Sequence, residues 1–340
     1  MKVRPHFYLG DSMKRLKPVL AGLLASVMSL LAQGDRDGKF QLALPAHNGQ
    51  LRWSAEGFKI VQNSAKPNGQ EIGVRAQGAG ERLSFLGFLF LFPELTPLSS
   101  GKCRDGVMGP EAKANPSLTI LESVENETGV ALVRYSEKGQ GGQVWYKVRG
   151  FLAQGDLCGD LEVYSKRPIR VDDAELKAIF DGYVLDGDYK PVSRDIFLYA
   201  QILFDTKQYK GAAPLFEAAL AKIEDGSLAF GSVQTGRRVI IDQAGMSYGI
   251  AGDLVKARAM LEKGIAQDPE YAMFYYNLAC ADAEEKKLNE AKVHLKAAFA
   301  RKANVIQGEV LPDPTQDDSF TPYKENQQFW SFVKGLQASR

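Results

Sequence analysis

Residues 241–299 read IDQAGMSYGIAGDLVKARAMLEKGIAQDPEYAMFYYNLACADAEEKKLNEAKVHLKAAF, and this stretch decides the fold of the second half of the chain. Shifted along itself by roughly 34 residues, it matches itself. The matched pairs are Ala244 with Leu278, Gly245 with Ala279, Gly252 with Lys286, Leu254 with Leu288, Ala257 with Ala291, Leu261 with Leu295 and Gly264 with Ala298. Small residues allow two helices to approach closely, and the larger apolar residues fill the space between them. The stretch therefore predicts a helical hairpin that occurs twice.

A weaker copy of the same pattern lies upstream of these two. It is separated from them by a longer connecting stretch, residues 221–238. The residues that fit the pattern in this copy are Tyr199, Ala200, Leu203, Tyr209, Ala212, Phe216 and Ala219. The sequence thus predicts three helical hairpins between residues 188 and 310.

The pattern resembles the tetratricopeptide repeat. The signature of that family places an aromatic residue and a Leu-small pair on the first helix of each unit, and Ala, an aromatic residue or Leu, and a small residue on the second. The residues that carry the resemblance are Tyr275, Leu278, Ala279 and Ala291 in the later copy, and Ala244, Gly245, Tyr248, Gly252, Ala257 and Pro269 in the earlier one. The resemblance covers residues 190–340 and implies an all-α superhelix. Since such repeats bind many unlike partners, it implies contact with another protein without naming that protein.

The resemblance also implies a binding surface, because the first helices of successive tetratricopeptide units line a concave groove. The positions carried over to this chain are Arg194, Phe197, Gln201, Phe204, Asp242, Met246, Ile250, Tyr276, Asn277 and Glu284. This set lacks the run of Lys, Arg and Asn with which some family members clamp the C-terminal carboxylate of a peptide, so binding of chaperone tails is not favoured. The alternative is that the protein's own β domain or linker fills the groove.

An aromatic segment follows the last repeat, at residues 311–340. The last repeat of an array leaves an apolar helix face bare, and an aromatic segment can cover it. The aromatic residues concerned are Phe320, Tyr323, Phe329, Trp330 and Phe332. We expect a capping segment, and the alternative is that Trp330 protrudes to hold a partner.

The N-terminus has the order of a secretory signal. Basic residues at 14–17 precede VLAGLLASVMSLLA at 19–32, which carries no charge and ends in a small residue. Fourteen residues reach only about 21 Å as a helix, short of the ~30 Å that a membrane span requires. We predict a signal peptide over residues 1–32, hence a secreted or periplasmic protein. The alternatives are an uncleaved anchor or a buried helix, and translation from Met13 would give a more usual signal.

The charge of the chain excludes some classes of partner. The 340 residues include 42 Lys and Arg and 41 Asp and Glu, for a formal charge of +1. Residues 1–32 hold five of the bases and one of the acids, which leaves 37 against 40, or −3. A mildly acidic chain has no electrostatic reason to seek nucleic acid or membranes. We therefore expect a protein or peptide partner, no nucleic acid, and no membrane span after cleavage, and the oligomeric state stays open.

Residues 35–187 are predicted to form a β-rich α+β domain of antiparallel strands with a closing helix, which makes the whole chain α+β in class. A hairpin is expected around the turn at 66–69, residues 94–117 are expected to be a loop with one short helix after Pro110, and 174–183 a helix. The expected strands are 40–44, 53–62, 71–76, 83–92, 118–125, 130–136, 143–153 and 157–165. The stretch from Trp53 to Gly69 is similar to an opening seen in small secreted bacterial α+β domains, which have the sheet-plus-helix shape of the photosystem II accessory protein family.

The first half contains two of the three cysteines, Cys103 and Cys158, and Cys280 lies in the repeats. In an oxidising compartment Cys103 and Cys158 could form a disulfide, and closing so long a loop would be worth roughly 4 kcal/mol. The alternative is two separate buried thiols.

The sequence contains no recognisable catalytic, cofactor-binding or metal-binding motif. His47 and His294 have no other His or Cys at ligand spacing. The carboxylate pairs, such as Asp172 with Asp173, lie where helix ends favour acids. The sequence therefore predicts a protein that is not an enzyme and needs no cofactor. The leading hypothesis is a secreted scaffold or adaptor that binds a polypeptide in the groove. The alternative is a β domain that binds a small molecule, a glycan or an envelope component, tethered to an assembly by the repeats.

Overall fold

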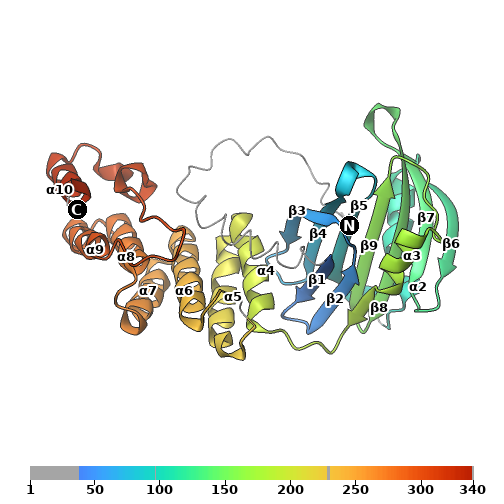
Figure 1. Cartoon of the computed structure of the whole chain (residues 1–340), viewed down its shortest axis with the longest axis horizontal. Coiled ribbons are helices and arrows are strands. Elements are labelled where there is room, and N and C mark those ends of the chain that lie inside the picture. The colour runs from blue at the N-terminus through green and yellow to red at the C-terminus, as the bar shows by residue number, and fades with distance from the viewer. Residues whose placement is uncertain (1–37, 96, 228–229, 339–340) are drawn as a thin grey trace. The chain divides into compact units, whose positions relative to one another are not determined.

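The computed structural model describes residues 38–95, 97–227 and 230–338 (Figure 1). The predicted signal peptide lies outside these ranges. The described chain divides between Pro191 and Val192 into a β domain and a helical domain. Within the described ranges, no helix combines the length and the apolar character that crossing a membrane requires.

The β domain is built on a seven-stranded antiparallel sheet with the order β3-β4-β5-β9-β8-β7-β6. The predicted hairpins are confirmed, because β3 pairs with β4, β6 with β7, and β8 with β9. The bounds are β3 Phe58–Ala65, β4 Glu71–Gly78, β5 Ser84–Leu91, β6 Thr119–Glu125, β7 Ala131–Lys138, β8 Val144–Gln154 and β9 Leu157–Ser165. The α+β class predicted from the sequence is thus the class observed.

A second, three-stranded sheet covers one face of this sheet. It has the order β1-β2-β10, and its strands are β1 Lys39–Leu44, β2 Gly49–Ser54 and β10 Val184–Asp186. Between the two sheets, the rings of Phe40, Trp53 and Phe85 meet with centroids 4.8–5.5 Å apart. Gly87 of β5 leaves room for Trp53, because a Cβ there would lie 2.8 Å from the indole.

Two helices pack on opposite faces of the large sheet. On β8, Gly150 lies against Phe180 of α3 (Ala174–Asp181), while the adjacent Arg149 reaches Glu111 of α2 (Ser100–Ala114). Successive side chains of a strand point to opposite faces, so α3 shares its face with the small sheet and α2 covers the other face.

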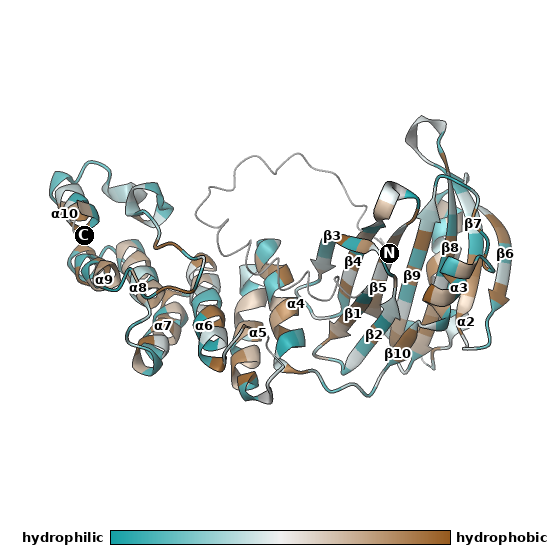
Figure 2. Ribbon diagram, viewed as in Figure 1, coloured by the Kyte–Doolittle hydropathy of each residue, from teal (hydrophilic) through white to brown (hydrophobic). Residues whose placement is uncertain are grey.

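Both edge strands of the large sheet are irregular at one position. Val61 in β3 and Leu121 in β6 have no opposite residue, since the register shifts between Ile60 and Gln62 and between Ile120 and Glu122. Val61 and Leu121 are 49% and 45% exposed. Hydrophobic colouring is visible along β6 in Figure 2.

Two predictions for the β domain are wrong. The strand expected over residues 53–62 is divided between β2 and β3, because Gly57 turns the chain with a φ of 76°. The segment expected to be mostly loop contains α2, a helix of 15 residues with Pro110 inside. Ser99 caps α2 by accepting a hydrogen bond from the Lys102 amide, and Gly106 lets Leu95 and Phe92 approach to a distance that a Cβ would block.

The helical domain consists of three antiparallel hairpins followed by a tail, which is a TPR-like arrangement of helical repeats (Figure 1). The hairpins are α4 Ser193–Asp205 with α5 Tyr209–Ala221, α6 Val233–Ile250 with α7 Leu254–Gln267, and α8 Ala272–Glu284 with α9 Leu288–Ala300. The small residues allow close approach as predicted: a Cβ on Gly245 would lie 2.8 Å from Leu261, and one on Gly264 would lie 2.8 Å from Phe274.

The first helix of each hairpin ends in the same way. Lys207, Gly252 and Lys286 have φ angles of 62°, 86° and 62°, in the left-handed region. After each of them, a backbone amide bonds back to the carbonyl five residues earlier, at 2.7–2.9 Å. This is a Schellman-type end, and it turns the chain into the second helix.

The C-terminal tail folds onto α8 and α9. It contains the 3₁₀ segments η5 Pro314–Gln316 and η6 Asp318–Tyr323, and the helix α10 Gln327–Ala338. Phe320, Phe329 and Val333 are buried in one cluster with Ala279 and Leu295 of the last hairpin.

Candidate functional site

The aromatic residues predicted for the groove of the first hairpin lie inside that hairpin. Phe197 and Phe204 on α4 are 1% and 3% exposed. Their rings face Phe216 of α5, with centroids 5.7 and 6.3 Å apart. The groove position assigned to these two residues does not match the structure, since their side chains are the hydrophobic contact between α4 and α5.

Three more of the predicted residues are buried. Gln201 donates to Asp205 of its own helix at 2.8 Å. Tyr276 of α8 lies beneath the tail, where its hydroxyl donates to Asp317 at 3.0 Å. Near the third hairpin, the chain's own tail therefore occupies the position expected for a partner.

Asp242 of α6 is the third of these buried residues, and it meets another predicted residue. Its Oδ1 accepts a hydrogen bond of 2.5 Å from Asn277 of α8, and its Oδ2 is buried without a hydrogen-bond partner among the described residues. Burial, together with the negative charge of Glu309, raises the pKa of Asp242 to about 8, although the hydrogen bond from Asn277 opposes this shift. Glu309 itself accepts from Tyr271 at 2.9 and 3.1 Å.

The remaining predicted groove residues are accessible. Arg194, Met246 and Asn277 are half-buried, and Ile250 and Glu284 are exposed at the C-terminal ends of α6 and α8. Of the predicted set, these five can meet a partner without unfolding a helix.

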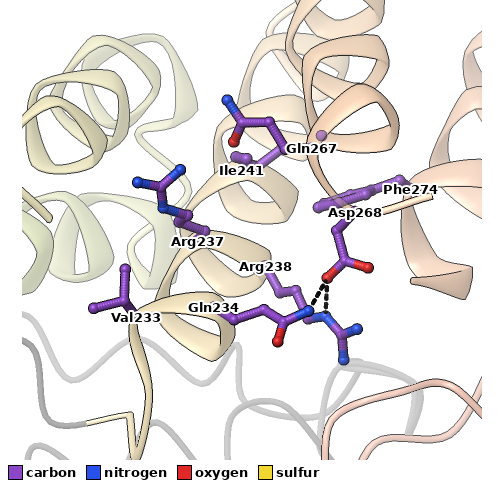
Figure 3. A pocket seen from close by; sticks show the side chains of 9 residues that line it. Val233, Gln234, Arg237, Arg238, Ile241, Gln267, Asp268 and Phe274 are labelled. Atoms are coloured by element: carbon purple, nitrogen blue, oxygen red, sulfur yellow. Dashed lines mark hydrogen bonds and ion pairs between the residues drawn. The ribbon is translucent and has the colours of Figure 1, made fainter. Parts of the chain in front are cut away.

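A pocket of about 270 Å³ lies between the second and third hairpins (Figure 3). It is formed by the first turns of α6, the end of α7 and one side chain of α8. We call it the inter-hairpin pocket, and its lining residues are Val233, Gln234, Arg237, Arg238, Ile241, Gly264, Gln267, Asp268 and Phe274. Ile241 and Phe274 give it an apolar floor, while guanidinium, amide and carboxylate groups surround its mouth.

Asp268 is neutralised within this pocket. Its Oδ2 accepts hydrogen bonds from Arg238 Nε at 2.6 Å and from Gln234 Nε2 at 2.9 Å, which Figure 3 shows as dashed lines. Although burial alone raises the pKa of Asp268, these two bonds bring it below its ordinary value. Arg238 also stacks over the ring of Tyr271, 4.8 Å from its centroid. The guanidinium of Arg238 and the carboxylate of Asp268 are thus fixed.

Arg237 is held differently. Its partner is Glu224 of the short η4 segment (Ile223–Asp225), outside the pocket lining, and the two side chains are 38% and 66% exposed. Neither Arg237 nor Arg238 could be identified from the repeat pattern, because both lie in the stretch between two repeat copies. The paired arginines directly before a repeat were the signal available there.

The β domain joins Cys103 and Cys158 in a disulfide, with Cα atoms 5.9 Å apart. The bond links α2 to β9 beside the buried Met108 and Phe151.

Next to the disulfide lies a buried ionic network that sequence reasoning missed. Arg149 of β8 binds Asp160 of β9 through two bonds of 2.6 and 2.5 Å, and Glu111 of α2 at 2.7 Å. Glu162 of β9 bonds Tyr135 and, at 3.0 Å, Lys147. The turn at 154–157 fixes the register of β8 and β9 and makes Arg149 the partner of Glu162, so the predicted hairpin held the signal.

The charges in this network compensate one another. Burial raises the pKa of Glu162, but the charges of Lys147 and Arg149 outweigh it and bring the value down to about 2. Burial and the charge of Glu162 raise the pKa of Tyr135 well above its ordinary value. With each acid facing a base, the arrangement favours a fixed contact between α2 and the sheet over acid–base chemistry.

Within the described residues, no group of three or more His, Cys, Asp or Glu side chains could hold a metal ion. His294 is hydrogen-bonded to Asp282 at 2.5 Å, and Asp282 also accepts a hydrogen bond from Arg258 at 2.6 Å. These contacts join α7, α8 and α9 and thereby connect the second and third hairpins.

Comparison with known families and with curated proteins finds no match. Among solved structures, the chain is similar to the TPR domain of Sgt2 from Aspergillus fumigatus, at 16% identity and a TM-score of 0.29, covering 43% of this chain and 76% of that one. It is also similar to a structure from Bacteroides thetaiotaomicron, at 10% identity and a TM-score of 0.29, covering 68% and 80%. Both TM-scores are low, and the repeat fold of this chain is evident from its three antiparallel hairpins.

Proposed function

We propose that this chain is a secreted or periplasmic scaffold without catalytic activity, whose helical repeats bind a polypeptide partner. The observation that carries the proposal is the inter-hairpin pocket, which combines an apolar floor with a charged and amide-bearing mouth on stacked helical hairpins. Such a surface can remove an apolar side chain of a partner from water while polar groups at the rim set its register.

Two of the accessible groove residues offer further contact points at the ends of α6 and α8 that lie away from the pocket. Ile250 is 57% exposed at the end of α6, and Glu284 is exposed at the end of α8. An apolar and an acidic contact at these points would add to the pocket without any rearrangement of the hairpin cores.

The test is capture of a partner from native extract with the chain from residue 33 onward as bait. We expect the double variant Ile250→Glu with Glu284→Lys to lose the partner that the parent chain retains, as measured by quantitative mass spectrometry. A matched control is Val255→Glu with Val293→Glu, since these valines are 78% and 65% exposed on the second helices α7 and α9. Retention of the partner by the first variant, or its equal loss from the control, would refute binding through the first helices.

A further inference from the structure

We propose that the inter-hairpin pocket is the anchor site for an acidic polypeptide segment: an apolar side chain enters the pocket, and a neighbouring carboxylate of the ligand replaces Glu224 at Arg237. The inference rests on the proposed function, because it assigns a ligand chemistry to one place on the repeat surface.

The size and floor of the pocket fit a side chain. A volume of about 270 Å³ lies just below the ~300–1,000 Å³ of pockets that bury whole small-molecule ligands. The floor is apolar, and Gly264 lets Phe274 and Ile241 pack closely against α7 there, since a Cβ at this position would lie 2.8 Å from Phe274 and 2.9 Å from Ile241. Val233, 42% exposed, extends the apolar surface to the mouth. An aliphatic side chain such as that of leucine matches the apolar floor of the pocket.

The charges of the lining residues determine which kind of ligand residue can lie next to the bound apolar side chain. The nine lining residues include two arginines and one acid, and the acid, Asp268, is already neutralised by Arg238. Arg237 is therefore the lining cation whose counter-ion comes from outside the pocket. A guanidinium binds a carboxylate through paired hydrogen bonds, so an acidic ligand gains a contact here that a neutral one lacks.

Glu224 stands in the free protein where the ligand carboxylate would bind. The Arg237–Glu224 pair is exposed on both sides, and exposed pairs contribute little to stability. Exchange of one carboxylate for another conserves the number of ion pairs, so Glu224 acts as an internal competitor. This predicts effects of opposite sign when the two partners are changed one at a time.

The experiment uses the full chain and two fluorescent peptides, acetylated and amidated, in which Leu alternates with Glu or with Gln. Binding is followed by fluorescence anisotropy at low ionic strength. We expect the Glu peptide to bind the parent chain more tightly than the Gln peptide. Relative to the parent, Arg237→Gln should weaken binding of the Glu peptide about fivefold, and Glu224→Gln should strengthen it about twofold to fivefold. Arg170→Gln, which removes an exposed arginine paired with Asp172 in the β domain, should leave the affinity unchanged.

Circular dichroism and the thermal midpoint of each variant establish that it is folded. The proposal is overturned when the two peptides bind equally, when the Glu peptide does not bind, or when Arg237→Gln and Glu224→Gln act in the same direction. If Ile250→Glu with Glu284→Lys abolishes capture of the native partner while Arg237→Gln leaves it unchanged, polypeptide binding stands and the assignment to this pocket falls.

Discussion

Lys207, Gly252 and Lys286 occupy the same left-handed position at the end of α4, α6 and α8. Glycine adopts this conformation without steric cost, whereas lysine brings its Cβ too close to the backbone. The middle hairpin has the favourable residue, and the first and third do not. Both lysines are exposed, so their side chains do not fix the turn.

The first prediction follows from this difference. Lys286→Gly should raise the free energy of unfolding by about 0.5–1 kcal/mol, since relief of the left-handed strain exceeds the added freedom of the unfolded chain. Denaturation by urea measures it. The control is Lys296→Gly, at an exposed position inside α9, where glycine should destabilise the helix by about 0.5–1 kcal/mol. Equal effects at the two positions would contradict the assignment.

At the scale of elements, the tail is joined to the last hairpin by aromatic packing. Phe329 of α10 is fully buried, and its ring lies 5.6 Å from Phe320 and 5.0 Å from Trp330. The Trp330 indole donates to the Tyr323 carbonyl at 2.9 Å, and the Tyr323 hydroxyl donates to the Ala283 carbonyl at 2.7 Å. The indole of Trp330 is thus hydrogen-bonded within the tail and does not protrude to hold a partner. The tail itself packs against α8.

The second prediction concerns this packing. Phe329→Ala should lower the free energy of unfolding of the helical domain by about 3–5 kcal/mol, the cost of a cavity at a fully buried aromatic residue. Gln337→Ala, on the exposed part of the same helix, should change it by less than about 0.5 kcal/mol. Urea denaturation followed by far-UV circular dichroism compares them. A loss below about 1 kcal/mol for Phe329→Ala would show that the tail is not part of the repeat core.

The elements that could be predicted from the sequence are those that depend on local pattern. Alternating apolar residues and the turn at 66–69 predict β3 and β4, and the spacing of small residues predicts the hairpins. The helix α2 could not be predicted, because its glycines and Pro110 oppose a helix locally. What sustains it is tertiary: its contacts with Phe92 and Leu95, the disulfide and the Arg149–Glu111 ion pair.

The candidate site was predictable only in part, for a similar reason. Repeat positions can be carried over from a family pattern. The particular side chains, however, decide which face of a helix its neighbour covers. Phe197 and Phe204 pack against Phe216 of α5 inside the hairpin, and the tail covers Tyr276. Arg237 lies outside any repeat copy, so no position in the pattern pointed to it.

At the scale of the whole molecule, buried acids of two kinds set how stability depends on pH. Hydrogen bonds and opposite charges hold the pKa of Glu162 at about 2 and those of Asp268 and Asp282 below their ordinary values, although burial opposes this at all three. Burial raises the pKa of Asp242 to about 8 and also raises that of Glu309. The stability that acids with a lowered pKa contribute to the fold is lost as pH falls. The stability that acids with a raised pKa contribute is lost as pH rises.

The third prediction is that the thermal midpoint is highest at about pH 4–5. Above the ordinary pKa of 3.8, the unfolded chain ionises at Asp242 while the folded chain keeps the proton, so stability falls until about pH 8. Asp242→Asn should match the parent near pH 4 and exceed its thermal midpoint increasingly toward pH 8. Asn277 can still donate to the remaining side-chain oxygen, while Glu309, Tyr271 and Arg238 are unchanged. Thermal unfolding from pH 3 to 9 tests this, and parallel profiles would contradict it.

The unmatched residues Val61 and Leu121 have a consequence for the protein in solution. A regular edge strand offers a row of free amides and carbonyls onto which the strand of another molecule can dock. One extra residue in each outer strand interrupts that row and increases the local twist. We therefore expect both edges of the seven-stranded sheet to resist pairing with a strand of another molecule, which would limit fibril formation in a crowded solution.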